Sequence, residues 1–145
     1  MAYEVTCFYP PVEGYGPLAT HHAVRVHNYI YEVTGNSGND SADAVACTPW
    51  NGRKEKLNRH TVKFEKLGKT SKNKSECDSF LRSYSRKYFP RGASDYNVIK
   101  NNCQGFSYAF AKFLDVSLPS PEFTESPGAA GEIFGQIKGP GCSPQ

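Results

Sequence analysis

The stretch that most constrains this chain is Asn101–Leu114, NNCQGFSYAFAKFL, which starts polar and then becomes an amphipathic run. Its apolar residues recur at helical spacing, which predicts a helix with one buried face. Cys103 falls at or just before the first turn, where the helix dipole and the unpaired N–H groups favour a thiolate over a thiol. Position alone does not separate a nucleophile from a packing cysteine, since cysteine is among the most buried residue types. The apolar positions are Phe106, Ala109, Phe110, Phe113 and Leu114.

Length and composition indicate one domain with its own core. The chain has 145 residues, of which 38% are hydrophobic. We expect the domain over residues 1–138 and a disordered tail over residues 139–145. The 17 basic and 14 acidic residues give a net charge of +3, which is too mild to indicate a nucleic-acid partner. The oligomeric state stays open.

No apolar run approaches the roughly 20 residues of a membrane span, so no stable membrane insertion is expected. The opening residues, MAYEVTCFYPP, lack the basic start and apolar stretch of a secretory signal. The expected location is therefore the cytoplasm, with the nucleus also open.

The cysteines do not form a metal or disulfide pattern. There are five of them, with no Cys-x-x-Cys pair and no Cys/His cluster at zinc-finger spacing. An odd number in a chain expected in the cytoplasm favours free thiols, and no metal or other cofactor is expected. Whether Cys142 is reactive stays open. The cysteines are Cys7, Cys47, Cys77, Cys103 and Cys142.

Three segments predict strands. Tyr3–Tyr9 is aromatic and β-branched, and it ends at two prolines. His21–Val33 predicts a hairpin that turns at His27-Asn28. His60–Leu67 alternates apolar and charged residues, which predicts a further strand. The polar stretch Gly35–Arg59 reads as a long loop, whose tryptophan we expect to anchor it on the body of the domain.

A second helix is predicted over Ser75–Phe89. Ser75 and Asp78 form a capping-box-like start, and Pro90 with Gly92 stops the helix. Its apolar stripe makes Cys77 a packing residue. Strands followed by two helices predict an α+β domain, in which a small mixed or antiparallel sheet packs against the cysteine-bearing helix and a second helix. The stripe comprises Cys77, Phe80, Leu81, Tyr84 and Tyr88.

Two adjacent histidines begin the predicted hairpin. By strand alternation, His21 shares a face with Arg25, whereas His22 shares the apolar face of Val24 and Val26. A general base must meet solvent and substrate, so His21 is favoured over His22. His60, at the mouth of another predicted strand, is the rival base.

Cysteine hydrolysis needs a thiolate, a nearby base and donors for the developing oxyanion. The backbone N–H groups of Cys103 and Gln104 could serve as donors. A third residue often orients the base, and Glu32, Asn101 and Asn102 are candidates. Their ordinary roles would be a solvated strand residue for Glu32 and helix capping for the two asparagines.

Two segments together resemble the PPPDE-type, deSUMOylating-isopeptidase-like cysteine peptidases. Tyr96–Leu114, YNVIKNNCQGFSYAFAKFL, is similar to their Asn-Cys, Phe-Ser motif with its apolar helix. His21–Gly35 is similar to their histidine segment. The resemblance covers most of the chain except Gly35–Arg59. Gln104 stands where the family has Asn, Gly105 is a weak helix former, and His21 has no aromatic residue before it; these differences bear on substrate choice.

The resemblance implies a circularly permuted papain-like fold and a catalytic dyad of His21 and Cys103. It also implies cleavage of isopeptide or peptide bonds to ubiquitin-like modifiers such as SUMO or ubiquitin, so the expected partner is such a modifier or a modified protein.

Two other functions compete with this one. Lecithin–retinol-acyltransferase-like lipid enzymes share the permuted order, and some PPPDE-type proteins are linked to removal of palmitate, so an acyl or thioester hydrolase is the first alternative. The lipid enzymes usually carry Asn-Cys-Glu-His-Phe, which Gln104-Gly105 does not match. The second alternative is a non-catalytic binding module on the same fold. Hydrolysis versus transfer to another acceptor stays open.

Overall fold

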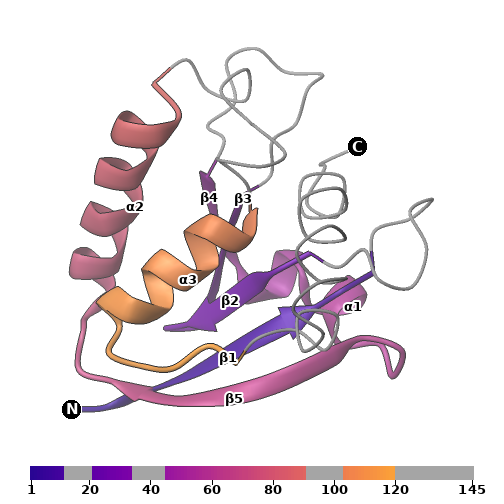
Figure 1. The fold of residues 1–145 in the computed structure, drawn as a ribbon. Coiled ribbons are helices and arrows are strands. Elements are labelled where there is room, and N and C mark those ends of the chain that lie inside the picture. Colours follow the sequence, from indigo (N-terminus) through magenta and orange to yellow (C-terminus); the bar gives the residue numbers. More distant parts are fainter. Residues whose placement is uncertain (12–20, 34–44, 91–102, 120–145) are drawn as a thin grey trace, which may run out of the picture.

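The computed structural model describes residues 1–11, 21–33, 45–90 and 103–119 (Figure 1). In these residues one antiparallel sheet has the strand order β4-β3-β2-β1-β5, and α2 and α3 lie beside it. The predicted α+β class is confirmed. The strands are β1 (Tyr3–Tyr9), β2 (Ala23–Val26), β3 (Tyr29–Val33), β4 (Val45–Pro49) and β5 (Lys63–Thr70); the helices are η1 (Trp50–Gly52), α1 (Lys54–Leu57), α2 (Lys74–Tyr88) and α3 (Cys103–Phe113).

The hairpin of β2 and β3 forms where the sequence predicts it. His27 and Asn28 have φ values of 57° and 65°, as a two-residue hairpin turn with the twist of the strands requires. Asparagine tolerates this conformation well, and the Asn28 side chain also accepts a hydrogen bond of 2.8 Å from Arg25. Because the turn is tight, Val26 lies directly opposite Tyr29 and the register of the hairpin is fixed.

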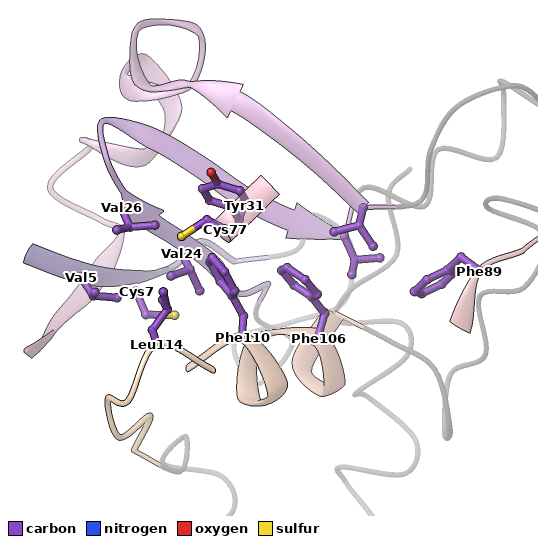
Figure 2. Close-up of a cluster of buried hydrophobic side chains, with 12 residues drawn as sticks. Val5, Cys7, Val24, Val26, Tyr31, Cys77, Phe89, Phe106, Phe110 and Leu114 are labelled. Atoms are coloured by element: carbon purple, nitrogen blue, oxygen red, sulfur yellow. The ribbon is translucent and has the colours of Figure 1, made fainter. Parts of the chain in front are cut away.

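The sheet separates two cores. The larger core lies between the sheet and the helices, and alternate residues of β1, β2 and β3 enter it from one face (Figure 2). Phe106 and Phe110 of α3 are fully buried there, as is Leu114 directly after the helix, so the predicted apolar stripe is confirmed. Each such aromatic ring contributes about 2–3 kcal/mol by leaving water. The opposite face carries a smaller core of Phe8, Ala23, Ile30, Leu57 and Val62, which α1 covers.

Helix α2 begins one residue earlier than predicted and has a different cap. The Asn73 side chain accepts from the Glu76 backbone N–H at 2.8 Å, and the Glu76 carboxylate accepts from the Asn73 N–H at 2.9 Å. Asn73 therefore forms the capping box in place of Ser75. Both the Asn73–Glu76 pair and the Ser75–Asp78 pair have the three-residue spacing of a capping box, but the helix begins at Lys74, so Ser75 already lies inside it. Cys77 is a packing residue as predicted, since it is fully buried.

The interpretation of Gly35–Arg59 as one polar loop is wrong for its described part. That part contains β4, η1 and α1, of which β4 pairs with β3 at the edge of the sheet. Trp50 anchors the segment as expected: its ring stacks on Phe8 at 5.4 Å, and the Arg25 guanidinium lies 3.9 Å from its centroid. The strand predicted at His60–Leu67 is displaced to Lys63–Thr70, and a bulge opposite Val5 and Thr6 interrupts its pairing with β1.

Candidate active site

Cys103 is the first residue of α3, where the sequence places it. The first turn of this helix has no acidic residue, so no side chain of that turn opposes the positive end of the helix dipole. Asn101 and Asn102 lie outside the described residues, as do the side chains of Cys103 and Gln104. The site is therefore built from the backbone of α3 and from the groups around the start of β2.

His22 joins the start of β2 to this helix. Its Nδ1 lies 2.7 Å from Oγ of Ser107, and both residues are fully buried. His22 lies on the face of Val24 and Val26, as strand alternation predicts. Ser107 follows Cys103 by four residues, which is about one helical turn or 6 Å along the axis. This contact brings the histidine pair next to the first two turns of the cysteine-bearing helix.

The His22–Ser107 contact also indicates at which end of the sheet the site lies. In Figure 1, α3 and β2 run in a similar direction, so both begin at the same end of the sheet. One step back from His22 along the chain leads to His21, and one turn back from Ser107 leads to Cys103. Both positions therefore lie beyond the His22–Ser107 contact, at the end of the sheet where β2 starts.

His21 belongs to a chain of three charged or titratable groups. Its Nε2 lies 2.7 Å from Oε1 of Glu32 on β3. The same carboxylate accepts two hydrogen bonds from Arg53, between η1 and α1: Nε to Oε2 at 2.8 Å, and a terminal nitrogen to Oε1 at 2.9 Å. The solvated reading of Glu32 is wrong, because only 4% of its side chain is exposed, against 15% for His21 and 22% for Arg53. These groups lie on the α1 side of the sheet, opposite His22.

The charge on Glu32 decides which nitrogen of His21 carries a proton. Burial alone would raise the pKa of Glu32, but the hydrogen bond and charge of His21 and the contacts of Arg53 outweigh it and lower the pKa below the usual range. Glu32 is thus a carboxylate at neutral pH, and a carboxylate only accepts hydrogen bonds. In neutral His21, Nε2 is therefore the donor, which leaves the acceptor lone pair on Nδ1.

The other two histidines are placed away from this arrangement. His27 lies at the turn that ends β2, where its Nε2 donates to the carbonyl of Lys72 at 2.7 Å. His60, the rival base, is exposed in the connection between α1 and β5.

Two residues around the histidines were missed in reading the sequence. Ser107 belongs to the Phe-Ser motif, so its position in that motif was the available signal. Arg53 had no signal, because it lies in a polar segment whose folding depends on tertiary contacts.

Among the described residues no group of three or more His, Cys, Asp or Glu side chains could hold a metal ion. No helix in the described part of the chain has the length and apolarity needed to span a membrane.

Comparison with known families decides the relationship. The model of the family described as the PPPDE putative peptidase domain matches residues 8–135, which is most of the chain. The chain belongs to this family. Membership supports a peptidase-type function acting on protein substrates, and the fold, with its antiparallel sheet and two packed helices, is consistent with a small papain-like PPPDE domain. The match also spans the segment between β3 and β5 that the sequence resemblance did not cover. A search of curated proteins found no match.

Proposed function

We propose that this PPPDE-family protein is a cysteine peptidase in which Cys103 is the nucleophile and His21 is the general base. The observation that carries the proposal is the His22–Ser107 contact of 2.7 Å, because it brings the start of β2 to the start of α3. The partial exposure of His21 supports it as the base, since the base must exchange protons with substrate and water. Nε2 of His21 is hydrogen-bonded to Glu32, so Nδ1 is the nitrogen that we assign to the Cys103 thiol.

The proposed mechanism begins with transfer of the Cys103 thiol proton to Nδ1 of His21. The thiolate then attacks the carbonyl carbon of the scissile amide, and backbone N–H groups at the start of α3 stabilise the oxyanion. When the intermediate collapses, the C–N bond breaks and the amine leaves with the proton from His21. Water then attacks the acyl-enzyme while His21 takes one of its protons, which releases the acid and restores the thiol.

The finer proposal concerns the substrate. We infer an isopeptide or peptide bond to a ubiquitin-like modifier, because the Asn-Cys and Phe-Ser motif and the histidine segment resemble those of the deSUMOylating-isopeptidase-like peptidases. The groove should then accept an extended chain ending in glycines. Glu32 acts in this reaction as the group that orients His21 and balances the charge of its imidazolium.

His22 is the competing base, because its contact reaches the cysteine-bearing helix directly. Complete burial argues against it, since a base enclosed by protein does not meet substrate. The first experiment is therefore the pH–rate profile for alkylation of Cys103, located by peptide mass. The variants are His21→Ala and His22→Asn, which keeps a polar group near Ser107, with the exposed His60→Ala as the matched control.

We expect the wild-type thiolate to have an apparent pKa within the roughly 3.5–7.5 range of activated cysteines. It should return toward the ordinary value of about 8.5 in His21→Ala and stay low in the other two variants. If the pKa of Cys103 returns to the ordinary value only in His22→Asn, the base is His22. If it returns only in His60→Ala, the base is His60. An ordinary pKa in the wild type would favour a binding module over an enzyme.

A substrate panel then tests the finer proposal. It contains isopeptide-linked SUMO and ubiquitin, linear peptide fusions and an acyl thioester, each with Cys103→Ala as the inactive control. Cleavage of the isopeptide substrates is the expected result, whereas cleavage of the thioester alone would favour the acyl-hydrolase alternative. Turnover that survives in Cys103→Ala would contradict the nucleophile assignment.

A further inference from the structure

The Arg53–Glu32 pair is the feature of this site that neither the motifs nor the family assignment explains. Arg53 comes from the turn between η1 and α1, far from the histidine segment in sequence, and it reaches the buried carboxylate with two parallel hydrogen bonds. Such paired contacts fix the plane of a carboxylate as well as its charge. Trp50, three residues earlier, stacks on Phe8 and holds the same segment against the sheet.

We propose that Arg53 is a positioning residue that acts through Glu32 to keep His21 in the tautomer with its acceptor on Nδ1. The inference rests on the proposed role of His21. Three distances define the relay: 2.8 and 2.9 Å from Arg53 to Glu32, and 2.7 Å from Glu32 to His21. With Arg53 in place, Oε1 and Oε2 are both acceptors, and the only proton between Glu32 and His21 belongs to Nε2.

The expected state of Glu32 and His21 in the absence of Arg53 shows what the arginine contributes. Among the described residues, the charged or titratable side chains that act on Glu32 are His21, from the segment before β2, and Arg53. Without Arg53, two of the contacts that lower the pKa of Glu32 are lost, so Glu32 would take up a proton at higher pH. A protonated Glu32 would donate to Nε2 of His21, which would move the ring proton to Nδ1 and remove the acceptor that the thiol needs.

The relay also gives β4, η1 and α1 a function. These elements lie between β3 and β5 and contribute no predicted site residue of their own. They bring the guanidinium to the face of the sheet opposite α3, so the base is held from one side of the sheet while the helix that begins at Cys103 lies on the other. Leu57 of α1, buried in the smaller core, ties this support to the sheet.

The test is the alkylation pH profile of Cys103 in Arg53→Met, with the exposed Arg59→Met as the matched control. An opposite charge within 4–6 Å shifts a carboxyl pKa by about 1–3 units. The pKa of Glu32 should therefore rise in Arg53→Met, and we expect the acidic midpoint of the alkylation profile to move to higher pH with it, by up to that amount, and to stay unchanged in Arg59→Met. A wild-type midpoint in Arg53→Met would overturn the inference.

Two further variants show whether Arg53 acts through Glu32. Arg53→Lys keeps the charge without the paired geometry and should give an intermediate midpoint. Arg53→Lys also serves as the test if Arg53→Met fails to fold. In that case a wild-type midpoint in Arg53→Lys would overturn the inference. In a Glu32→Gln background the Arg53→Met change should have no further effect, because its target is gone. A shift that persists in this background would contradict the relay.

A direct readout is the ring ¹⁵N spectrum of His21, which separates this inference from the function of the site. We expect the Nε2–H tautomer in the wild type and a rising share of Nδ1–H in Arg53→Met as the pH falls toward that of the shifted midpoint. If His21→Ala leaves the alkylation profile unchanged, the proposed base is wrong. If His21→Ala changes the profile and Arg53→Met changes neither the profile nor the tautomer, only the role of Arg53 is wrong.

Discussion

His22 Nδ1 lies 2.7 Å from Ser107 Oγ, across the interface between the sheet and the helix that begins at Cys103. Both side chains are fully buried, so the contact replaces hydration that each group loses on folding. It couples two segments that are 85 residues apart in the chain. The position of the cysteine-bearing helix relative to the histidine pair thus depends on a polar contact as well as on the aromatic stripe of α3.

Ser107→Ala should therefore destabilise the protein. The change removes an acceptor or donor from a buried imidazole, which costs about 1–3 kcal/mol of unfolding free energy. Chemical denaturation measures the effect, with Ser83→Ala on the exposed surface of α2 as the matched control. An equal and small effect of both changes would show that the contact adds little to stability.

Glu32→Gln should reduce turnover without unfolding the protein. The amide keeps the shape of the carboxylate but replaces the charged acceptor for His21 with a neutral one. A hydrogen bond to a charged group contributes about 1.5–3 kcal/mol, which corresponds to about a 10- to 100-fold change in rate. Activity on the preferred substrate of the panel measures it, and turnover equal to wild type would show that Glu32 has only a structural role.

The same carboxylate should make stability depend on pH on the acidic side. The folded-state pKa of Glu32 is lowered, so its stabilising contribution is present above the unfolded pKa, near the model-compound value of 4.5, and is lost as pH falls through the folded value. We expect the stability difference between wild type and Glu32→Gln to shrink on moving from pH 7 to pH 3. Denaturation curves at the two pH values measure it, and a difference that grows at pH 3 would contradict the sign.

The sequence predicts the parts of this fold whose signals are local. β1, the hairpin turn at His27 and Asn28, and the start of α3 are where periodicity and turn chemistry place them. β4 was missed because VACTP has neither alternation nor a run of strand-forming residues, and its pairing with β3 supplies the missing stability. The strand predicted at His60–Leu67 begins and ends earlier than β5, because the outward-facing lysines of β5 interrupt the apolar alternation from which its bounds were predicted.

The candidate site was predictable only in part. Adjacent histidines and strand alternation suffice to place His21 and His22 on opposite faces. The burial of Glu32 was not predictable, because it depends on Arg53, and no spacing rule relates a residue after β4 to one on β3. Relays of this kind appear only when the tertiary fold is known.

The buried thiols should be silent toward alkylation in the folded protein, which is what makes the Cys103 measurement possible. Burial is the main cause that raises the pKa of both Cys7 and Cys77 to about 12, and both side chains are fully enclosed. At pH 8 we expect iodoacetamide to leave both unmodified over the time that labels Cys103, and to modify both once denaturant unfolds the chain. Peptide mapping of native and denatured samples measures this, with the partly exposed Cys47 as the internal comparison. Native labelling of Cys77 at the rate of Cys47 would show that the interface of α2 with the sheet opens readily, and the helix packing described above would then be wrong.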